Sequence, residues 1–265
     1  MTGEPRPPVN EVVLSVALAR QSALSGPLLS DVLGDWFQTH PRVEIAPPYE
    51  MPPETPGLVA TPQAPPFQVI MAAPMFPRYW LVSPDDQELV QVQTNYLAIN
   101  WRRRDATHDY PGYDEMRTRF VSLLQTAESG LSRHQGTLKP TRVELTYINL
   151  LHPDNIWSSH EGTHKIVALT VPNGLDYERL SFTYSQALVD SEKQFSGRLH
   201  VVLNPAVDWI KQEPQLILTL TARSADLADQ NIDAALHFLD LAHIAAEDSF
   251  HRLISEAARQ VWGLT

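Results

Sequence analysis

Polar side chains interrupt three apolar segments that are typical of β-strands, and their types suit the binding of a polar ligand. An arginine binds anionic groups, and side-chain amides hydrogen-bond to the backbone of a peptide or to a small molecule. Side chains alternate between the two faces of a strand, so within each segment the polar residues share one face. They are Gln91, Gln93, Asn100, Arg102 and Glu144.

These five side chains form one binding face only if their strands are neighbours in a sheet. The structural alternative is that Arg102 pairs with Glu144 across the sheet while the amides cap strand edges. Cross-strand ion pairs of this kind are common and contribute about 0.2–1 kcal/mol. The sequence leaves both interpretations open.

The last helical segment carries four side chains of types that ligate metals: Asp240, His243, Glu247 and His251. At about 100° per residue, three of them lie within about 40° of one another on the helix. The apolar stripe of the same helix lies well away from them, so we expect a solvated face on which Glu247 pairs with His251. The spacing also differs from the zincin pattern. We therefore predict no metal and keep these residues as weak candidates.

Composition excludes several classes of site. The chain has 265 residues and no cysteine, which excludes disulfides, thiolate metal sites and thiol nucleophiles. It lacks a nucleophile elbow, a phosphate-binding loop and a dinucleotide fingerprint, so we predict no catalytic residue and no cofactor. A formal net charge of −11 makes nucleic acid an unsuitable partner. No apolar run is long enough to span a membrane, and we predict a cytoplasmic protein.

The first part of the chain, residues 1–152, is expected to be an α+β unit. Strands are predicted at 11–18, 67–71, 78–82, 89–93, 96–102 and 141–151, and helices at about 26–39 and 113–135. Residues 41–77 hold 11 of the 22 prolines, so this segment can form neither a helix nor a central strand. We expect it to be an extended connection wrapped over the sheet, and the alternative is an arm that recognises a partner.

The second part, residues 153–265, is expected to be a four-strand meander followed by a helical segment over about 230–262. Its strands are predicted at 164–171, 179–188, 197–204 and 215–222. Strands in series followed by a helix indicate an antiparallel sheet. The predicted fold is therefore α+β, with two antiparallel sheet-plus-helix halves and a long C-terminal helical segment.

Four short motifs occur in a fixed order: Leu89-Val-Gln-Val-Gln93, Asn100-Trp-Arg102, Tyr110-Pro111 and Val143-Glu-Leu-Thr-Tyr-Ile-Asn149. In this combination the chain resembles a sporadically distributed bacterial protein family of about this length. The resemblance spans nearly the whole chain and implies no particular activity, although the patchy distribution of the family suggests a defence or toxin–antitoxin-like neighbourhood. The motifs add Tyr110, Tyr147 and Asn149 to the candidate binding residues.

The leading hypothesis is a non-enzymatic protein that binds a protein partner or a small polar ligand. An acidic antitoxin-like or chaperone-like partner of another gene product is a related form. The second hypothesis is an enzyme with an unrecognised site, such as a hydrolase that uses Glu144 with a histidine. The third is a structural subunit of a larger assembly, and all three are compatible with a homo-oligomer.

Overall fold

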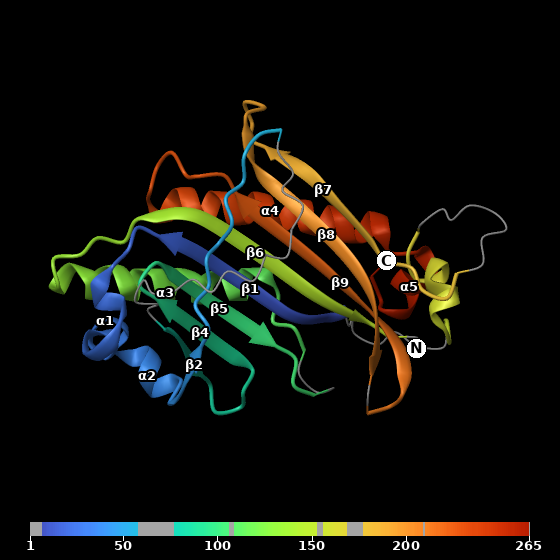
Figure 1. Ribbon diagram of the computed structural model, residues 1–265, viewed down its shortest axis with the longest axis horizontal. Helices are drawn as coiled ribbons and strands as arrows, with labels where there is room; N and C mark the ends of the chain where they lie inside the picture. Colours follow the sequence, from blue (N-terminus) through green and yellow to red (C-terminus); the bar gives the residue numbers. More distant parts are fainter. Residues whose placement is uncertain are drawn as a thin grey trace, which may run out of the picture.

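The described residues build one antiparallel sheet with helices packed on it. The computed structural model describes residues 7–57, 77–105, 109–152, 156–168, 177–208 and 210–264. Within them the sheet has nine strands in the order β2-β3-β4-β5-β1-β6-β9-β8-β7 (Figure 1). The fold is therefore α+β, as the sequence predicts. The strands are β1 (Val9–Leu18), β2 (Arg42–Ala46), β3 (Arg78–Val82), β4 (Glu88–Gln93), β5 (Tyr96–Arg102), β6 (Pro140–Leu151), β7 (Phe182–Val189), β8 (Phe195–Asp208) and β9 (Glu213–Ser224).

The centre of the sheet joins the first strand of the chain to β6. β1 pairs with β5 on one side and with β6 on the other, both antiparallel. On each side of this pair lies a run of three consecutive strands, and the last strand of each run is next to the pair: β5 of β3-β4-β5 lies beside β1, and β9 of β7-β8-β9 lies beside β6. The sheet is therefore continuous across residue 152.

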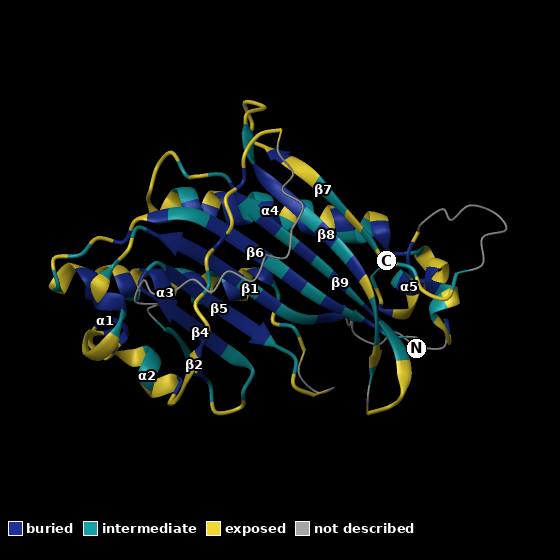
Figure 2. Cartoon of the chain, viewed as in Figure 1, coloured by how far each residue is buried: buried dark blue, intermediate teal, exposed yellow. Residues whose placement is uncertain are grey.

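Two long helices cover one face of the sheet, which we call the inner face (Figure 1). α3 (Tyr113–Arg133) packs on β5 and β1, and α4 (Ile232–Leu253) packs on β6, β8 and β9. The Asn231 side chain caps α4 by accepting a hydrogen bond from the Ala234 amide at 2.8 Å. Buried apolar residues of both helices meet the apolar positions of the central strands and form the main core (Figure 2).

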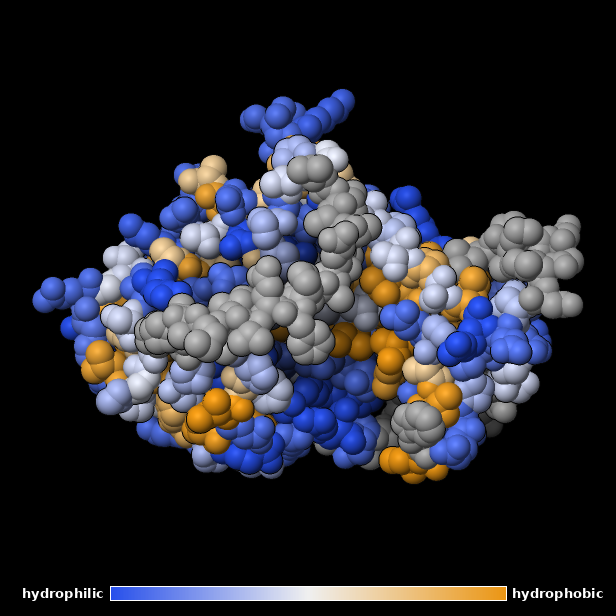
Figure 3. Space-filling view, in the orientation of Figure 1, coloured by the Kyte–Doolittle hydropathy of each residue, from blue (hydrophilic) through white to orange (hydrophobic). Residues whose placement is uncertain are grey.

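The opposite, outer face carries the chain that follows β2. Residues 47–57, which we call the arm, cross this face and contact β4, β6 and β8 in turn (Figure 1). Of the segment 41–77, the arm is thus the expected extended connection over the sheet, whereas Arg42–Ala46 form the edge strand β2. Residues 58–76, which include the strand predicted at 67–71, lie outside the described residues. Hydrophilic side chains gather in the lower middle of the outer face, around the end of β5 (Figure 3).

Several short elements differ from the sequence-based expectation. The helix predicted at 26–39 is divided into η2 (Gly26–Leu28), α1 (Leu29–Leu33) and α2 (Asp35–Thr39), with Gly34 at φ 28° between the last two. Of the strand predicted at 164–171, residues 164–168 form no strand. His160–Lys165 is a 3-10 helix (η3), and Val167 makes one bridge to Ile254. The Thr163 hydroxyl donates to the His160 carbonyl at 2.6 Å, a local bond that favours the turn over extended chain. The remaining short helices are η1 (Ser22–Leu24) and α5 (Glu256–Val261).

Candidate functional site

The predicted polar residues lie on both faces of the sheet. Gln91, Gln93, Asn100 and Glu144 are on the outer face with the arm, and all four are buried. Tyr147 and Asn149 follow Glu144 in β6 by odd numbers of residues, so alternation places them on the inner face beside α4. The structure therefore separates the candidates into an outer cluster and an inner cluster.

Two amides of the outer cluster form a chain of hydrogen bonds with a carboxylate across three strands. The Gln91 Nε2 donates to Asn100 Oδ1 at 2.8 Å, and Asn100 Nδ2 donates to Glu11 Oε1 at 2.6 Å. These residues belong to β4, β5 and β1, which are neighbours in that order. Of the five residues expected to converge, Gln91 and Asn100 are thus joined, and most of the hydrogen-bonding capacity of Asn100 is used within the sheet.

The cross-strand pair between Arg102 and Glu144 is not formed, so that structural alternative is wrong. In the register of β1, Arg102 lies opposite Glu11 whereas Glu144 lies opposite Ser15. Four residues of extended strand offset the two by about 13 Å along the strand direction, and β1 lies between their strands. Arg102 instead donates to the carboxylate of Asp86 at 3.1 Å, in the turn between β3 and β4.

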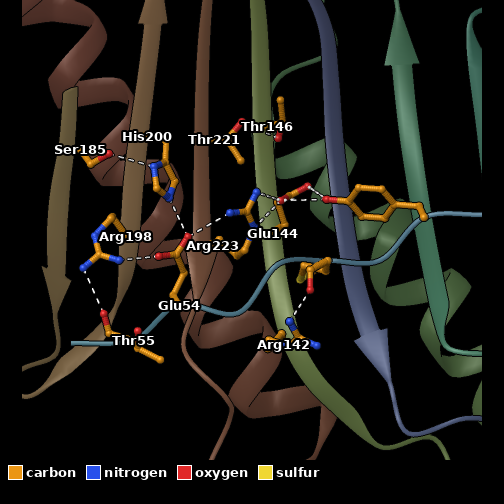
Figure 4. A network of polar contacts seen from close by, with 12 residues as sticks. Glu54, Thr55, Arg142, Glu144, Thr146, Ser185, Arg198, His200, Thr221 and Arg223 are labelled. Atoms are coloured by element: carbon orange, nitrogen blue, oxygen red, sulfur yellow. Dashed lines mark hydrogen bonds and ion pairs between the residues drawn. The ribbon is translucent and has the colours of Figure 1, made fainter. Parts of the chain in front are cut away.

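Glu144 belongs to a buried ionic network that the arm completes (Figure 4). Arg223 of β9 lies directly opposite Glu144 and contacts its carboxylate at 2.6 Å. The other side of the same guanidinium donates to Glu54 of the arm at 2.9 Å. The Tyr49 hydroxyl, also from the arm, lies 3.2 Å from both carboxylate oxygens of Glu144. Arg223 therefore bridges two carboxylates, one from the sheet and one from the arm.

Glu54 is the most heavily bonded group of this network. Its Oε2 pairs with Arg198 at 2.6 Å, and its Oε1 contacts His200 Nε2 at 2.6 Å as well as Arg223. His200 is held in turn by the Ser185 hydroxyl, 2.9 Å from Nδ1. Burial raises the pKa of Glu54, but the hydrogen bonds from His200 and Arg198 and the charge of Arg223 outweigh it and hold that pKa below 4.5.

Sequence reasoning missed the arm's partners in β8 and β9. Arg198 and His200 occupy alternate positions of the strand predicted at 197–204, which was the available signal for a shared face. Arg223 lies one residue beyond the strand predicted at 215–222. Their common partner, Glu54, sits among prolines that carry no strand signal, so nothing in the pattern linked it to them.

The inner cluster lines a cavity of about 210 Å³ between the sheet and α4. Six predicted residues contribute to it: Tyr110, Tyr147, Asn149, His243, Glu247 and His251. The other walls are mainly apolar and come from β1, β9, α4 and both ends of the described chain; they are Pro7, Val9, Leu220, Ala246, Phe250 and Leu264. Residues chosen from separate motifs, and from the weak metal candidates, thus share one site.

A tyrosine–histidine pair forms the polar side of the cavity. The Tyr147 hydroxyl lies 3.0 Å from His243 Nδ1, and the imidazole stacks on Tyr113 with 4.0 Å between ring centroids. Burial lowers the pKa of His243 below 6.5, so its neutral form accepts the hydrogen bond from Tyr147 at neutral pH. Burial also raises the pKa of Tyr147, which keeps the hydroxyl protonated.

The acidic residues near His243 are engaged elsewhere or stand too far away for ligation. Asp240 accepts hydrogen bonds from Tyr113 and Arg117, both at 2.8 Å. Glu247 lies 3.9 Å from His243 Nε2, so the predicted pairing of Glu247 with His251 is replaced by a longer contact to His243. Over the described ranges, no three histidine, aspartate or glutamate side chains are grouped to hold a metal ion.

The hydrolase hypothesis required Glu144 to act with a histidine in a pocket. The side-chain contacts of Glu144 in the described structure are to Arg223 and Tyr49, and the arm lies over it. The closest histidine in the same network is His200, which reaches Glu144 only through Glu54 and Arg223. This geometry does not put a general base beside Glu144.

The fold and its two clusters define an α+β protein with one antiparallel sheet, an arm on its outer face and a cavity on its inner face. Comparisons of the chain with protein-family models, with curated proteins and with solved structures found no match. Among the described residues no helix combines the length and apolar character needed to cross a membrane.

Proposed function

We propose that this protein binds a small ligand in the inner cavity, and that the ligand is largely apolar with one hydrogen-bonding group. The volume of about 210 Å³ suits a compact molecule, and the mainly apolar walls favour its hydrophobic part. Tyr110, Tyr147 and Asn149 are polar groups of the cavity lining. Tyr147 bonds to His243, and the Asn149 Nδ2 donates to the Leu218 carbonyl at 3.2 Å, so Tyr110 is the group left for a ligand. This is the small-ligand form of the binding hypothesis drawn from the sequence.

The observation that carries the proposal is the hydroxyl of Tyr110. It is buried, and its polar neighbour is the Tyr147 hydroxyl, with which it interacts without reaching normal hydrogen-bond geometry. The neighbouring Tyr147 hydroxyl is engaged with His243. Burial raises the pKa of Tyr110 to about 12, so the group is a neutral phenol that can donate or accept. A buried hydroxyl that is left without a good hydrogen bond costs up to about 1–3 kcal/mol, and a ligand that bonds to it would recover part of this cost.

Native mass spectrometry of the protein purified from its own host tests the proposal. We expect a bound small molecule on the wild-type chain and none on Ala246→Phe, whose ring would fill the cavity from the buried face of α4. Ile244→Phe is the matched control, because Ile244 lies on the same helix, is 58% exposed and does not line the cavity. Equal occupancy of Ala246→Phe and wild type would contradict the site.

A second variant separates blocked binding from lost folding. His251→Trp changes a partly exposed residue at the cavity and leaves the main core in place. Its thermal transition is expected to match that of the ligand-free wild type while the bound molecule is lost. A wild-type protein that carries no small molecule and gains no thermal stability from a library of small aromatic alcohols and acids would overturn the proposal.

A further inference from the structure

The arm lies on the outer face in the manner of a bound peptide. Among the described residues, no backbone–backbone hydrogen bond joins residues 47–54 to another part of the chain. Sheet side chains bond to its backbone instead. Gln93 accepts from the Tyr49 amide at 2.9 Å and donates to the Tyr49 carbonyl at 3.0 Å, and Arg142 donates to the Met51 carbonyl. The sheet therefore keeps its own ladder of hydrogen bonds whether or not the arm is present.

Three side chains anchor the arm. The Tyr49 ring contacts Tyr96 edge to face, with 5.0 Å between centroids, and the Arg78 guanidinium lies 5.7 Å from the Tyr49 ring. Met51 is buried in a small apolar cluster of the outer face, which also contains Ala17 and Ala98. Glu54 is the third anchor. The residues between them, Glu50, Pro52 and Pro53, are exposed.

The site of Glu54 has the features of an anion-binding site built into the sheet. Arg198 and Arg223 lie directly opposite each other on β8 and β9, where two like charges repel. The Glu54 carboxylate bonds to both of them and to His200. The Arg198 Nη2 also donates to the Thr55 carbonyl at 3.2 Å. A carboxylate is needed to balance the charge of the two arginines, and a backbone carbonyl is needed to accept the remaining hydrogen bond of Arg198.

We propose that the outer face is a peptide-recognition surface that the arm occupies in cis. Its partner in trans is an extended, proline-containing peptide with an aromatic residue, an apolar residue two positions later and an acidic residue three positions after that. This is the pattern of Tyr49, Met51 and Glu54. Prolines restrict such a peptide to extended conformations before binding, which lowers the entropy cost of docking. The surface lies on the other side of the sheet from the inner cavity and is independent of it.

Competition by the arm makes the proposal measurable. A tethered segment has an effective concentration on the order of millimolar, so the wild-type chain binds a free peptide weakly. The double variant Tyr49→Ala/Glu54→Ala removes two anchors of the arm and leaves every residue of the sheet face unchanged. The probe is a fluorescent synthetic peptide with the sequence of residues 46–57, titrated with the full-length chain and followed by anisotropy.

We expect the double variant to bind this peptide more than about tenfold more tightly than the wild type. The same peptide with glutamine in place of Glu54 should bind about tenfold more weakly, because Arg198 and Arg223 no longer meet a negative charge. Failure of the folded double variant to bind the peptide would overturn the proposal. Equal binding of the glutamine or a scrambled peptide would do the same.

A second variant covers the case in which the double variant does not fold. Pro52→Gly/Pro53→Gly changes exposed residues only, keeps all three anchors and makes the arm more flexible. Ordering a more flexible arm costs more entropy, so its occupancy of the face falls. We expect the affinity for the free peptide to rise above that of the wild type. An affinity unchanged from the wild type would count against exchange between the arm and the peptide.

Discussion

The carboxylate of Glu54 and the guanidinium of Arg198 form an ion pair with 2.6 Å between Oε2 and Nη1, although 144 positions separate them in the chain. Each side chain is only 5% exposed, so salt screens the pair weakly. Arg223, also in contact with Glu54, extends the pair to Glu144 on the neighbouring strand. This pair fixes the arm to β8. Its loss should therefore lower the stability of the protein and make the outer face more accessible.

Replacement of Glu54 by glutamine is expected to lower the free energy of unfolding by roughly 3 kcal/mol, because it leaves Arg198 buried without a counter-charge. Urea denaturation measures the change. Glu50→Gln is the matched control, since Glu50 lies in the same arm, is exposed and should change stability by less than about 0.5 kcal/mol. Similar losses in the two variants would show that the ion pair does not hold the arm.

Acid should weaken the same contact. The pKa of Glu54 in the folded chain lies below 4.5, the value for the free carboxyl, because burial, which raises it, is outweighed by the hydrogen bonds from His200 and Arg198 and by the charge of Arg223. Between these two pKa values the unfolded chain binds more protons than the folded chain. The stabilisation is therefore present above pH 4.5 and is lost as the pH falls through the folded pKa. Urea midpoints measured down this range should fall less steeply for Glu54→Gln than for the wild type, and parallel curves would contradict the assignment.

The sequence could predict the elements with strong periodic patterns but not how they meet. The strand at 96–102 and the helix at 113–135 are found as β5 and α3 within about two residues, because apolar spacing alone defines them. The insertion of β1 between β5 and β6 carries no local signal, since pairing partners and register depend on distant residues. That register is what separates Arg102 from Glu144.

The residues of the candidate site were also predictable only where a local pattern defines their position. Alternation alone assigns Glu144 and Tyr147 to opposite faces, as the structure has them. The convergence of Tyr110 with Tyr147 and His243 depends on how a loop and α4 fold over the sheet, which no spacing encodes. Glu54 was missed because its chemistry depends on where a proline-rich segment lies, and prolines specify only that the segment is extended.

Because α1 packs closely on α3, we expect a glycine-to-alanine substitution in α3 to lower the stability of the protein, opposite to the usual effect in a helix. Alanine in place of glycine normally stabilises a helix by about 0.5–1 kcal/mol. At Gly130 of α3 an added Cβ would lie 2.2 Å from the Val32 carbonyl oxygen and 2.6 Å from its Cα. Backbone atoms cannot rotate away, so Gly130→Ala should instead destabilise the protein by roughly 1–3 kcal/mol. Thermal unfolding measures the sign.

The adjacent residue provides the control for this prediction. Ser129 is exposed on the same helix, so Ser129→Ala gains helix propensity and should raise stability by up to about 0.5 kcal/mol. Opposite shifts in the two variants confirm that α1 approaches α3 closely at Gly130. A stabilised Gly130→Ala would mean that this approach is absent in solution.

The tyrosine–histidine pair of the cavity should make the stability of the protein depend on pH in a second range, which is higher than the range set by Glu54. Burial holds the pKa of His243 in the folded chain below 6.5, although Glu247, Asp114 and Asp240 act in the opposite direction. The unfolded chain therefore takes up a proton first as the pH falls. Stability declines below pH 6.5 until the folded pKa is passed, and above pH 6.5 this contribution is constant.

His243→Phe should reduce this decline, because phenylalanine keeps a ring against Tyr113 and cannot be protonated. It also leaves the Tyr147 hydroxyl without its partner, so we expect stability at about pH 7.5 to fall by about 1–3 kcal/mol. Urea denaturation at about pH 7.5 and about pH 5.5 separates the two effects. His237→Phe, at an exposed position of α4, is the control and should keep the wild-type pH dependence. If His243→Phe loses as much stability on acidification as the wild type, the buried neutral histidine does not set this range, and the polar side of the cavity must be assigned differently.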